Sequence, residues 1–193
     1  MKTRILSGIL LLFFFSNCSQ QESKNPSQTP PPQESTLAGL TNDQKIEKIN
    51  AYLDSLNRVE DFAVQKFNLN FYSDKDKAFL RTKNGEKISL VTTTYPPNEE
   101  TRDFYAFKDG QLINYKHREW FKQDNPRAKE INCYMDERGI FHVLERSIQL
   151  SAGQNPSPVL SLPYTESTLN KDSLLNIIQA DLKRIETVGA SPK

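Results

Sequence analysis

The sequence predicts an α+β domain in which an antiparallel β-meander of about six strands is flanked by an N-terminal and a C-terminal helix. Three observations predict this class. Apolar residues recur at helical spacing only near the two ends of the domain, strand-like apolar runs fill the middle, and turn residues separate those runs. Strands that follow one another through hairpins, with helices only at the ends, are typical of α+β folds.

The first helix is expected over residues 42–60, where Thr41 and Gln44 match a capping box. The second is expected over about residues 170–188, with Asn170 as its N-cap and Gly189 as its stop. Both helices should be amphipathic and should cover one face of the sheet. Their apolar faces are Ile46, Ile49, Leu53, Leu56 and Val59 in the first, and Leu174, Ile178, Leu182 and Ile185, widened by Leu175 and Ile177, in the second.

Three hairpins are expected between the helices, after a short alternating run at residues 67–71. The first joins residues 77–83 to 86–93 through Asn84-Gly85, because both central residues of a tight hairpin turn need positive φ. The second joins residues 101–107 to 111–121 through Asp109-Gly110, and the third joins residues 130–135 to 140–146. The turns predict these cross-strand pairs: Phe79 with Leu90, Arg81 with Ile88, Phe107 with Leu112, and Ala106 with Ile113.

The hairpin segments at residues 103–113 and 133–139 resemble those of small envelope lipoprotein domains, in which an aromatic strand, an Asp-Gly turn and another strand form a β-meander. This resemblance covers about residues 75–146 and implies no activity.

Residues 1–17 have the features of an export signal. Lys2 and Arg4 form a short basic segment, and the run from Ile5 to Phe15 is apolar except for Ser7 and Gly8. This run is about half of the roughly 20 residues that cross a bilayer as a helix, and it fits the apolar region of a signal peptide. Its removal would take the formal net charge of the chain from +1 to −1.

The residues before Cys18 indicate which kind of signal this is. An ordinary signal peptide has small residues at positions −3 and −1, where this chain has Phe15 and Asn17. Phe15-Ser16-Asn17-Cys18 resembles the lipobox of bacterial lipoproteins, with Phe and Asn in place of the usual Leu and Gly or Ala. The resemblance implies Sec-type export, lipidation of Cys18 and a lipid anchor in the inner or outer membrane. The alternative is a plain signal or a short anchor with a chance cysteine.

The segment after Cys18 is expected to be a tether. Residues 19–36 are rich in Ser, Gln and Pro and hold no large apolar residue, so they cannot form a core. The prolines at 30–32 favour an extended chain; a Pro-rich ligand for an SH3-like partner is the alternative. The predicted organisation is a signal peptide at 1–17, a tether at 18–38 and an α+β globular domain at 39–190.

The sequence contains no motif for catalysis, metal binding or a cofactor. His117 and His142 are far apart, and HExxH, CxxC, Gly-x-Ser-x-Gly and Gly-rich phosphate loops are absent. Cys133 is expected in the core, because it shares a strand face with Ile131 and Met135. Carboxylates are plentiful at Glu99, Glu100, Asp103 and Glu119, but the sequence does not place two of them in one cleft. The charge near zero argues against a nucleic-acid partner.

Residues 115–121 carry the candidate interaction surface. On one strand face Lys116 and Arg118 accompany Trp120, the only tryptophan. Trp and Arg are enriched at interface hot spots; the alternative is a solvated strand with Trp120 packed under a helix or under the two cationic stems.

These features favour a membrane-anchored envelope lipoprotein that is a non-enzymatic binding module for an envelope protein, peptide or glycan partner. The alternatives are a structural or assembly subunit of an envelope complex, and a hydrolase that acts on envelope polymers.

Overall fold

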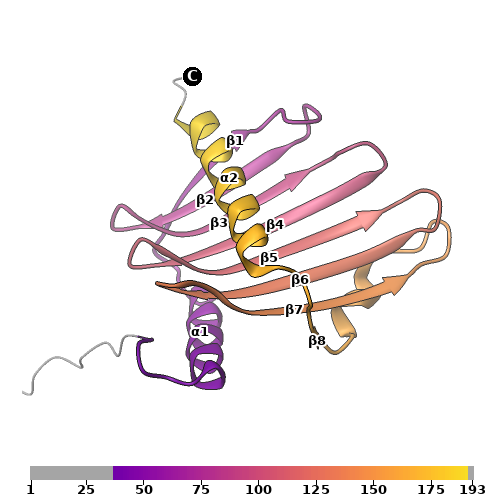
Figure 1. Cartoon of the computed structure of the whole chain (residues 1–193). Coiled ribbons are helices and arrows are strands. Elements are labelled where there is room, and N and C mark those ends of the chain that lie inside the picture. The colour runs from indigo at the N-terminus through magenta and orange to yellow at the C-terminus, as the bar shows by residue number, and fades with distance from the viewer. Residues whose placement is uncertain (1–36, 191–193) are drawn as a thin grey trace, which may run out of the picture. The chain divides into compact units, whose positions relative to one another are not determined.

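A computed structural model describes residues 37–190, which form a single sheet with helices on it (Figure 1). The predicted signal peptide, Cys18 and nearly all of the predicted tether lie outside the described residues. The elements in chain order are α1 (Asn42–Leu56), β1 (Ala63–Asn68), β2 (Lys77–Lys83), β3 (Glu86–Thr94), β4 (Glu99–Lys108), β5 (Gln111–Phe121), β6 (Arg127–Asp136), β7 (Gly139–Gln149), the 3₁₀-helix η1 (Ser157–Ser161), β8 (Thr165–Glu166) and α2 (Lys171–Gly189).

The α+β class is confirmed, and the sheet is an antiparallel meander in the order β1 to β8. The expected count of about six strands was wrong, because the described sheet has eight. The three hairpins supply β2 to β7. β1 adds one edge, and it lies earlier than the alternating run suggested, since Asn70 has φ +52° and the chain turns there. The two-residue β8, which pairs with β7, adds the other edge.

The two helices cover opposite faces of the sheet, not one face as expected (Figure 1). Neighbouring strand residues point to opposite faces, and Tyr105 belongs to the core beneath α2 whereas Ala106 belongs to the core beneath α1. The α2 core contains Ile178 and Ile185 from the helix, both almost fully buried, and the α1 core contains Ile49 and Leu56. Both faces of the sheet are therefore covered in part.

The predicted N-terminal caps of both helices are confirmed, but the predicted stop at Gly189 was wrong, because α2 ends with Ala190 as its C-cap. Thr41 accepts a hydrogen bond from the Gln44 backbone while the Gln44 side chain accepts from the Thr41 backbone, and the Asn170 side chain accepts from the Ser173 backbone. α1 ends at Leu56, four residues before the expected end, so Val59 lies outside it. α2 runs one residue past the expected end and includes Gly189.

β-bulges change the register that the turns predict. In the first hairpin an irregularity between Arg81 and Thr82 sets Arg81 opposite Ser89 and Phe79 opposite Val91, so both predicted pairs were wrong. A two-residue turn implies a ladder without insertions, and a bulge adds one residue to one strand. In the second hairpin the pair of Phe107 with Leu112 is confirmed, but a bulge follows and Ala106 faces Asn114 instead of Ile113.

Buried polar contacts join α1 to the sheet. Nζ of Lys45 lies 2.5 Å from Oδ2 of Asp136, and both side chains are only 1% exposed. Further along the helix, the Tyr134 hydroxyl donates to the Asn50 side chain. Buried polar groups stabilise a structure only when they are paired, so these bonds select one position for α1. Neither α1 nor α2 meets the length and apolarity that a membrane-crossing helix requires, among residues 37–190.

Candidate functional site

The candidate site is a groove of about 500 Å³ between α2 and the sheet. Strands β3 to β6 form its floor, and Ile177, Asp181 and Arg184 of α2 line one side. Phe71 and Tyr72, from the segment that follows β1, line it as well. Pockets of 300–1,000 Å³ with an apolar lining and a few polar groups are typical of small-molecule sites.

A hydrogen-bonded cluster around Asp103 lies on the groove floor. Oδ1 of Asp103 lies 2.7 Å from Nδ1 of His117 and accepts a hydrogen bond from the Tyr115 hydroxyl at 2.7 Å. Its Oδ2 accepts a bond from the Thr92 hydroxyl at 3.2 Å. The strand pairing explains the cluster, because β4 places Asp103 directly opposite His117 of β5.

His117 lies between two carboxylates. Its Nε2 is 3.6 Å from Oε2 of Glu119, on the side away from Asp103. Burial by itself would lower the pKa of His117, but the bonds to Asp103 and Glu119 outweigh it and raise this pKa to about 10. The same contact with His117 lowers the pKa of Glu119. His117 is therefore an imidazolium at neutral pH.

Two more carboxylates line the groove without a hydrogen bond or ion pair from any residue of the described range. They are Glu99 of β4 and Asp181 of α2, both partly buried. Burial raises the pKa of Glu99, and the charge of Glu119 adds to this effect. Burial likewise raises the pKa of Asp181, with a further contribution from Asp103. Nearby cations oppose these increases, His117 and Arg127 at Glu99 and Arg184 and His117 at Asp181.

Aromatic rings and an arginine occupy the side of the groove near α2. The guanidinium of Arg184 lies 3.5 Å from the ring centroid of Phe71 and 5.9 Å from that of Tyr72. Tyr105 and Tyr115 are almost fully buried in the floor, with ring centroids 5.0 Å apart. Burial raises the pKa of Tyr115, followed by the effect of the Asp103 charge, so its hydroxyl stays protonated and donates.

His117 is poorly suited to act as a general base. A general base works best when its pKa is near the operating pH, and His117 keeps its proton at neutral pH with both ring nitrogens facing carboxylates. Within residues 37–190, no group of three or more His, Cys, Asp or Glu side chains is placed to hold a metal ion.

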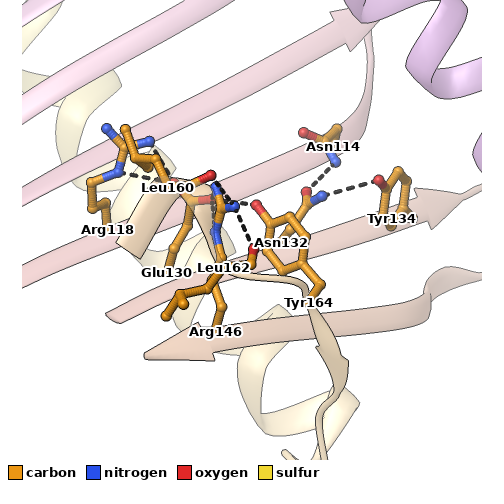
Figure 2. A network of polar contacts seen from close by, with 9 residues as sticks. All are labelled: Asn114, Arg118, Glu130, Asn132, Tyr134, Arg146, Leu160, Leu162 and Tyr164. Atoms are coloured by element: carbon orange, nitrogen blue, oxygen red, sulfur yellow. Dashed lines mark hydrogen bonds and ion pairs between the residues drawn. The ribbon is translucent and has the colours of Figure 1, made fainter. Parts of the chain in front are cut away.

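The predicted interaction surface lies on the other face of the sheet, where Arg118 takes part in a polar network (Figure 2). Both Nε and Nη2 of Arg118 donate to Oε2 of Glu130, which is 2% exposed. Arg146 donates to the other oxygen of Glu130, as does the Tyr164 hydroxyl. Arg146 also donates to the backbone oxygen atoms of Leu160 and Leu162, which ties the η1 segment to the sheet (Figure 2).

Lys116 and Trp120 lie on the same face as Arg118 but in different surroundings. Lys116 lines a smaller pocket of about 290 Å³ with Arg118 and Glu130, and burial lowers its pKa. Trp120 is partly buried against the small core of Ala128, Leu150 and Val159, and the cation above its ring, at 4.5 Å, belongs to Lys122. A role of this face in partner binding stays a prediction.

The other residues that the sequence singled out are widely separated. His142 lies on the α1 side opposite Tyr134, so the two histidines do not meet. Cys133 is fully buried in the core beneath α2, as predicted, and burial raises its pKa to about 12. Glu100 contacts Lys122 at 3.1 Å and does not line the groove.

Sequence reasoning noted Glu99, Asp103 and Glu119 but could not bring them together, and it missed Asp181. Alternation within β4 places Glu99 and Asp103 on one face, a signal that the sequence does carry. Asp181 follows Ile178 by three residues on α2, at the border of the apolar face, which gives no sign of what lies opposite. The groove therefore depends on tertiary packing.

Comparison with known proteins found no match to this chain among protein-family models, curated proteins or solved structures.

Proposed function

We propose that this chain is a lipoprotein of the bacterial cell envelope, anchored through lipid on Cys18, and that its globular part is a non-enzymatic binding module. The ligand occupies the groove beneath α2. The observation that carries the proposal is the groove itself, about 500 Å³ in volume, with the Asp103–His117 cluster on its floor. The anchor rests on the sequence of residues 1–18.

Several features support binding over catalysis. His117 is held as an imidazolium between carboxylates, a state that fixes charge in place and does not accept a proton at neutral pH. The one cysteine of the described residues, Cys133, is buried and its raised pKa keeps it a thiol. The groove thus offers fixed hydrogen-bond acceptors and aromatic surface and lacks an activated nucleophile of this type.

Binding can be tested with two tryptophan substitutions on α2. Ile177 is 58% exposed and lines the groove, so Ile177→Trp should obstruct it. Gln179 is exposed and lies two residues further, about 200° around the helix, so Gln179→Trp is the matched control. The full chain, purified in detergent from membranes, would be tested by thermal shift against peptides, disaccharides, amines and carboxylates of defined structure. At least one class should raise Tm in the wild type and the control but not in Ile177→Trp. An equal response in all three proteins, or none at all, would contradict the proposal.

The anchor needs a separate test, metabolic labelling with radioactive palmitate. Cys18→Ala should abolish incorporation of label and should leave residues 1–17 uncleaved. Cys133→Ala is the matched control, because the buried thiol of Cys133 is in the domain core, and it should incorporate label as the wild type does. Label in Cys18→Ala, or wild-type protein with a free first cysteine, would rule out the lipid anchor.

A further inference from the structure

We propose that the groove beneath α2 recognises an organic cation, namely a ligand that carries a protonated amine on an apolar group. This inference rests on the proposed binding function and specifies the chemistry of its ligand.

The lining of the groove has more carboxylates than cations able to neutralise them. Its carboxylates are Glu99, Asp103, Glu119 and Asp181, and its cations are His117, Lys129 and Arg184. Two of the cations already have carboxylate partners. His117 is bound by Asp103 and Glu119, and Nζ of Lys129 lies 3.0 Å from Oε2 of Glu145 outside the lining. Arg184 is stacked on Phe71, and its charge acts on Asp181 from a distance without an ion pair.

The two unpaired carboxylates come from different elements and line the same groove. Glu99 is on β4 and Asp181 is on α2, and neither has a hydrogen bond or ion pair from the described residues. A partly buried carboxylate without a partner loses hydration that nothing replaces. An ammonium group in the groove would supply three donors to the carboxylate that it reaches and would remove that loss.

The aromatic lining suits the apolar part of such a ligand and also favours its charge. Cations are attracted to the faces of aromatic rings, and Phe71 and Tyr72 already hold the guanidinium of Arg184 at 3.5 Å and 5.9 Å. The partly buried Ile131 and Leu174 add aliphatic surface. A bare metal ion is a poorer fit, because no group of three or more ligating side chains is placed to hold one in residues 37–190.

The test compares three probes that share a phenethyl group and end in an ammonium, a hydroxyl or a carboxylate: phenethylammonium, 2-phenylethanol and 3-phenylpropionate. Each is titrated by calorimetry into the full chain purified in detergent, with detergent alone as the blank. The ammonium should bind about tenfold more tightly than the alcohol, as expected for hydrogen bonds to charged groups. The carboxylate should bind more weakly than the alcohol, and added salt should weaken only the ammonium.

Three substitutions test where the ammonium group of the ligand binds. At least one of Glu99→Gln and Asp181→Asn should weaken ammonium binding by about tenfold and leave the alcohol unchanged. Arg184→Gln removes a cation from the rim and should strengthen ammonium binding, the opposite sign. Glu137→Gln, an exposed carboxylate in the turn between β6 and β7, is the matched control and should change nothing.

The outcomes separate this inference from the proposed function. Tighter binding of the alcohol or the carboxylate, lost in Ile177→Trp, would overturn the cation specificity and leave the groove as a binding site. Absence of ammonium binding, or ammonium affinity unchanged in both carboxylate variants, would also overturn the cation specificity. A different result would show that the groove is not a binding site: the thermal shifts would then persist in Ile177→Trp.

Discussion

The imidazolium of His117 should make the stability of this protein depend on pH in a way that His117→Gln removes. Asp103 and Glu119 raise the pKa of His117 from 6.5 to about 10. Because the pKa is higher in the folded state than in the unfolded state, the stabilisation is fully present below about pH 6.5. It decreases as the pH rises and is lost when the pH passes the folded-state pKa of about 10.

The size of the effect follows from the width of that window. One pKa unit corresponds to about 1.36 kcal/mol, so the interval between 6.5 and about 10 sets an upper limit of about 5 kcal/mol. Between pH 7 and pH 9 the unfolded chain has released this proton and the folded chain still holds it. The free energy of unfolding should therefore fall by about 3 kcal/mol over these two pH units. The side chain of His117 is 23% exposed, so solvent screens the interaction only in part.

Urea denaturation at pH 7 and pH 9, followed by the fluorescence of the single tryptophan, measures this difference. His117→Gln keeps a donor toward Asp103 but cannot carry the charge, so the decrease of about 3 kcal/mol should disappear in this variant. His142→Gln is the matched control and should retain the decrease seen in the wild type. Parallel pH profiles for the wild type and His117→Gln would refute the reasoning, because His117 would then be neutral in the folded protein.

Four further substitutions test how the fold is held together, each by urea or thermal denaturation at pH 7. Asp136→Asn should cost about 3–5 kcal/mol, because it leaves the Lys45 ammonium buried without a carboxylate. Lys45→Met should cost less than Asp136→Asn, since Asp136 keeps its contacts with the guanidinium and the backbone N–H of Arg138. Equal costs of the two substitutions would contradict this account. Glu130→Gln should cost about 3 kcal/mol, as two arginines lose their shared carboxylate, and a loss below about 1 kcal/mol would show that the network is dispensable. Gly85→Ala should cost about 1 kcal/mol and lower Tm by about 2–4 °C. This cost is backbone strain at φ +84° alone, because the added methyl group meets open space and causes no clash.

Local signals made the helices and turns predictable from the sequence. Thr41, Gln44 and Asn170 act through hydrogen bonds to backbone groups within three residues, so their pattern is readable without tertiary structure. Asn84-Gly85 and Asp109-Gly110 are equally local, since each turn needs positive φ and has it. The same locality explains why α+β could be predicted from the order of elements.

The strand register and the face of the sheet that each helix covers were not predictable, because they depend on insertions and packing. Without its bulge, the second hairpin would set Asp103 opposite Lys116, and the bulge moves His117 into that position. This one-residue shift creates the central contact of the groove. The opposite placement of α1 and α2 was also hidden, since each helix pattern shows an apolar face but not which side of the sheet receives it.

The two carboxyl groups without a partner are the strongest argument that the groove beneath α2 has a function. Beneath α1 the almost fully buried charges are paired, as Lys45 with Asp136 and Glu130 with two arginines, so these charges serve stability. Beneath α2, the carboxyl groups of Glu99 and Asp181 lie partly buried in a groove where no described residue forms a hydrogen bond or ion pair with them, and burial raises their pKa. Replacement by Gln or Asn would relieve the cost of burying a charge at little loss of packing. Features that work against stability concentrate at functional sites, so a ligand that compensates for these two carboxylates is the simplest reason for their presence.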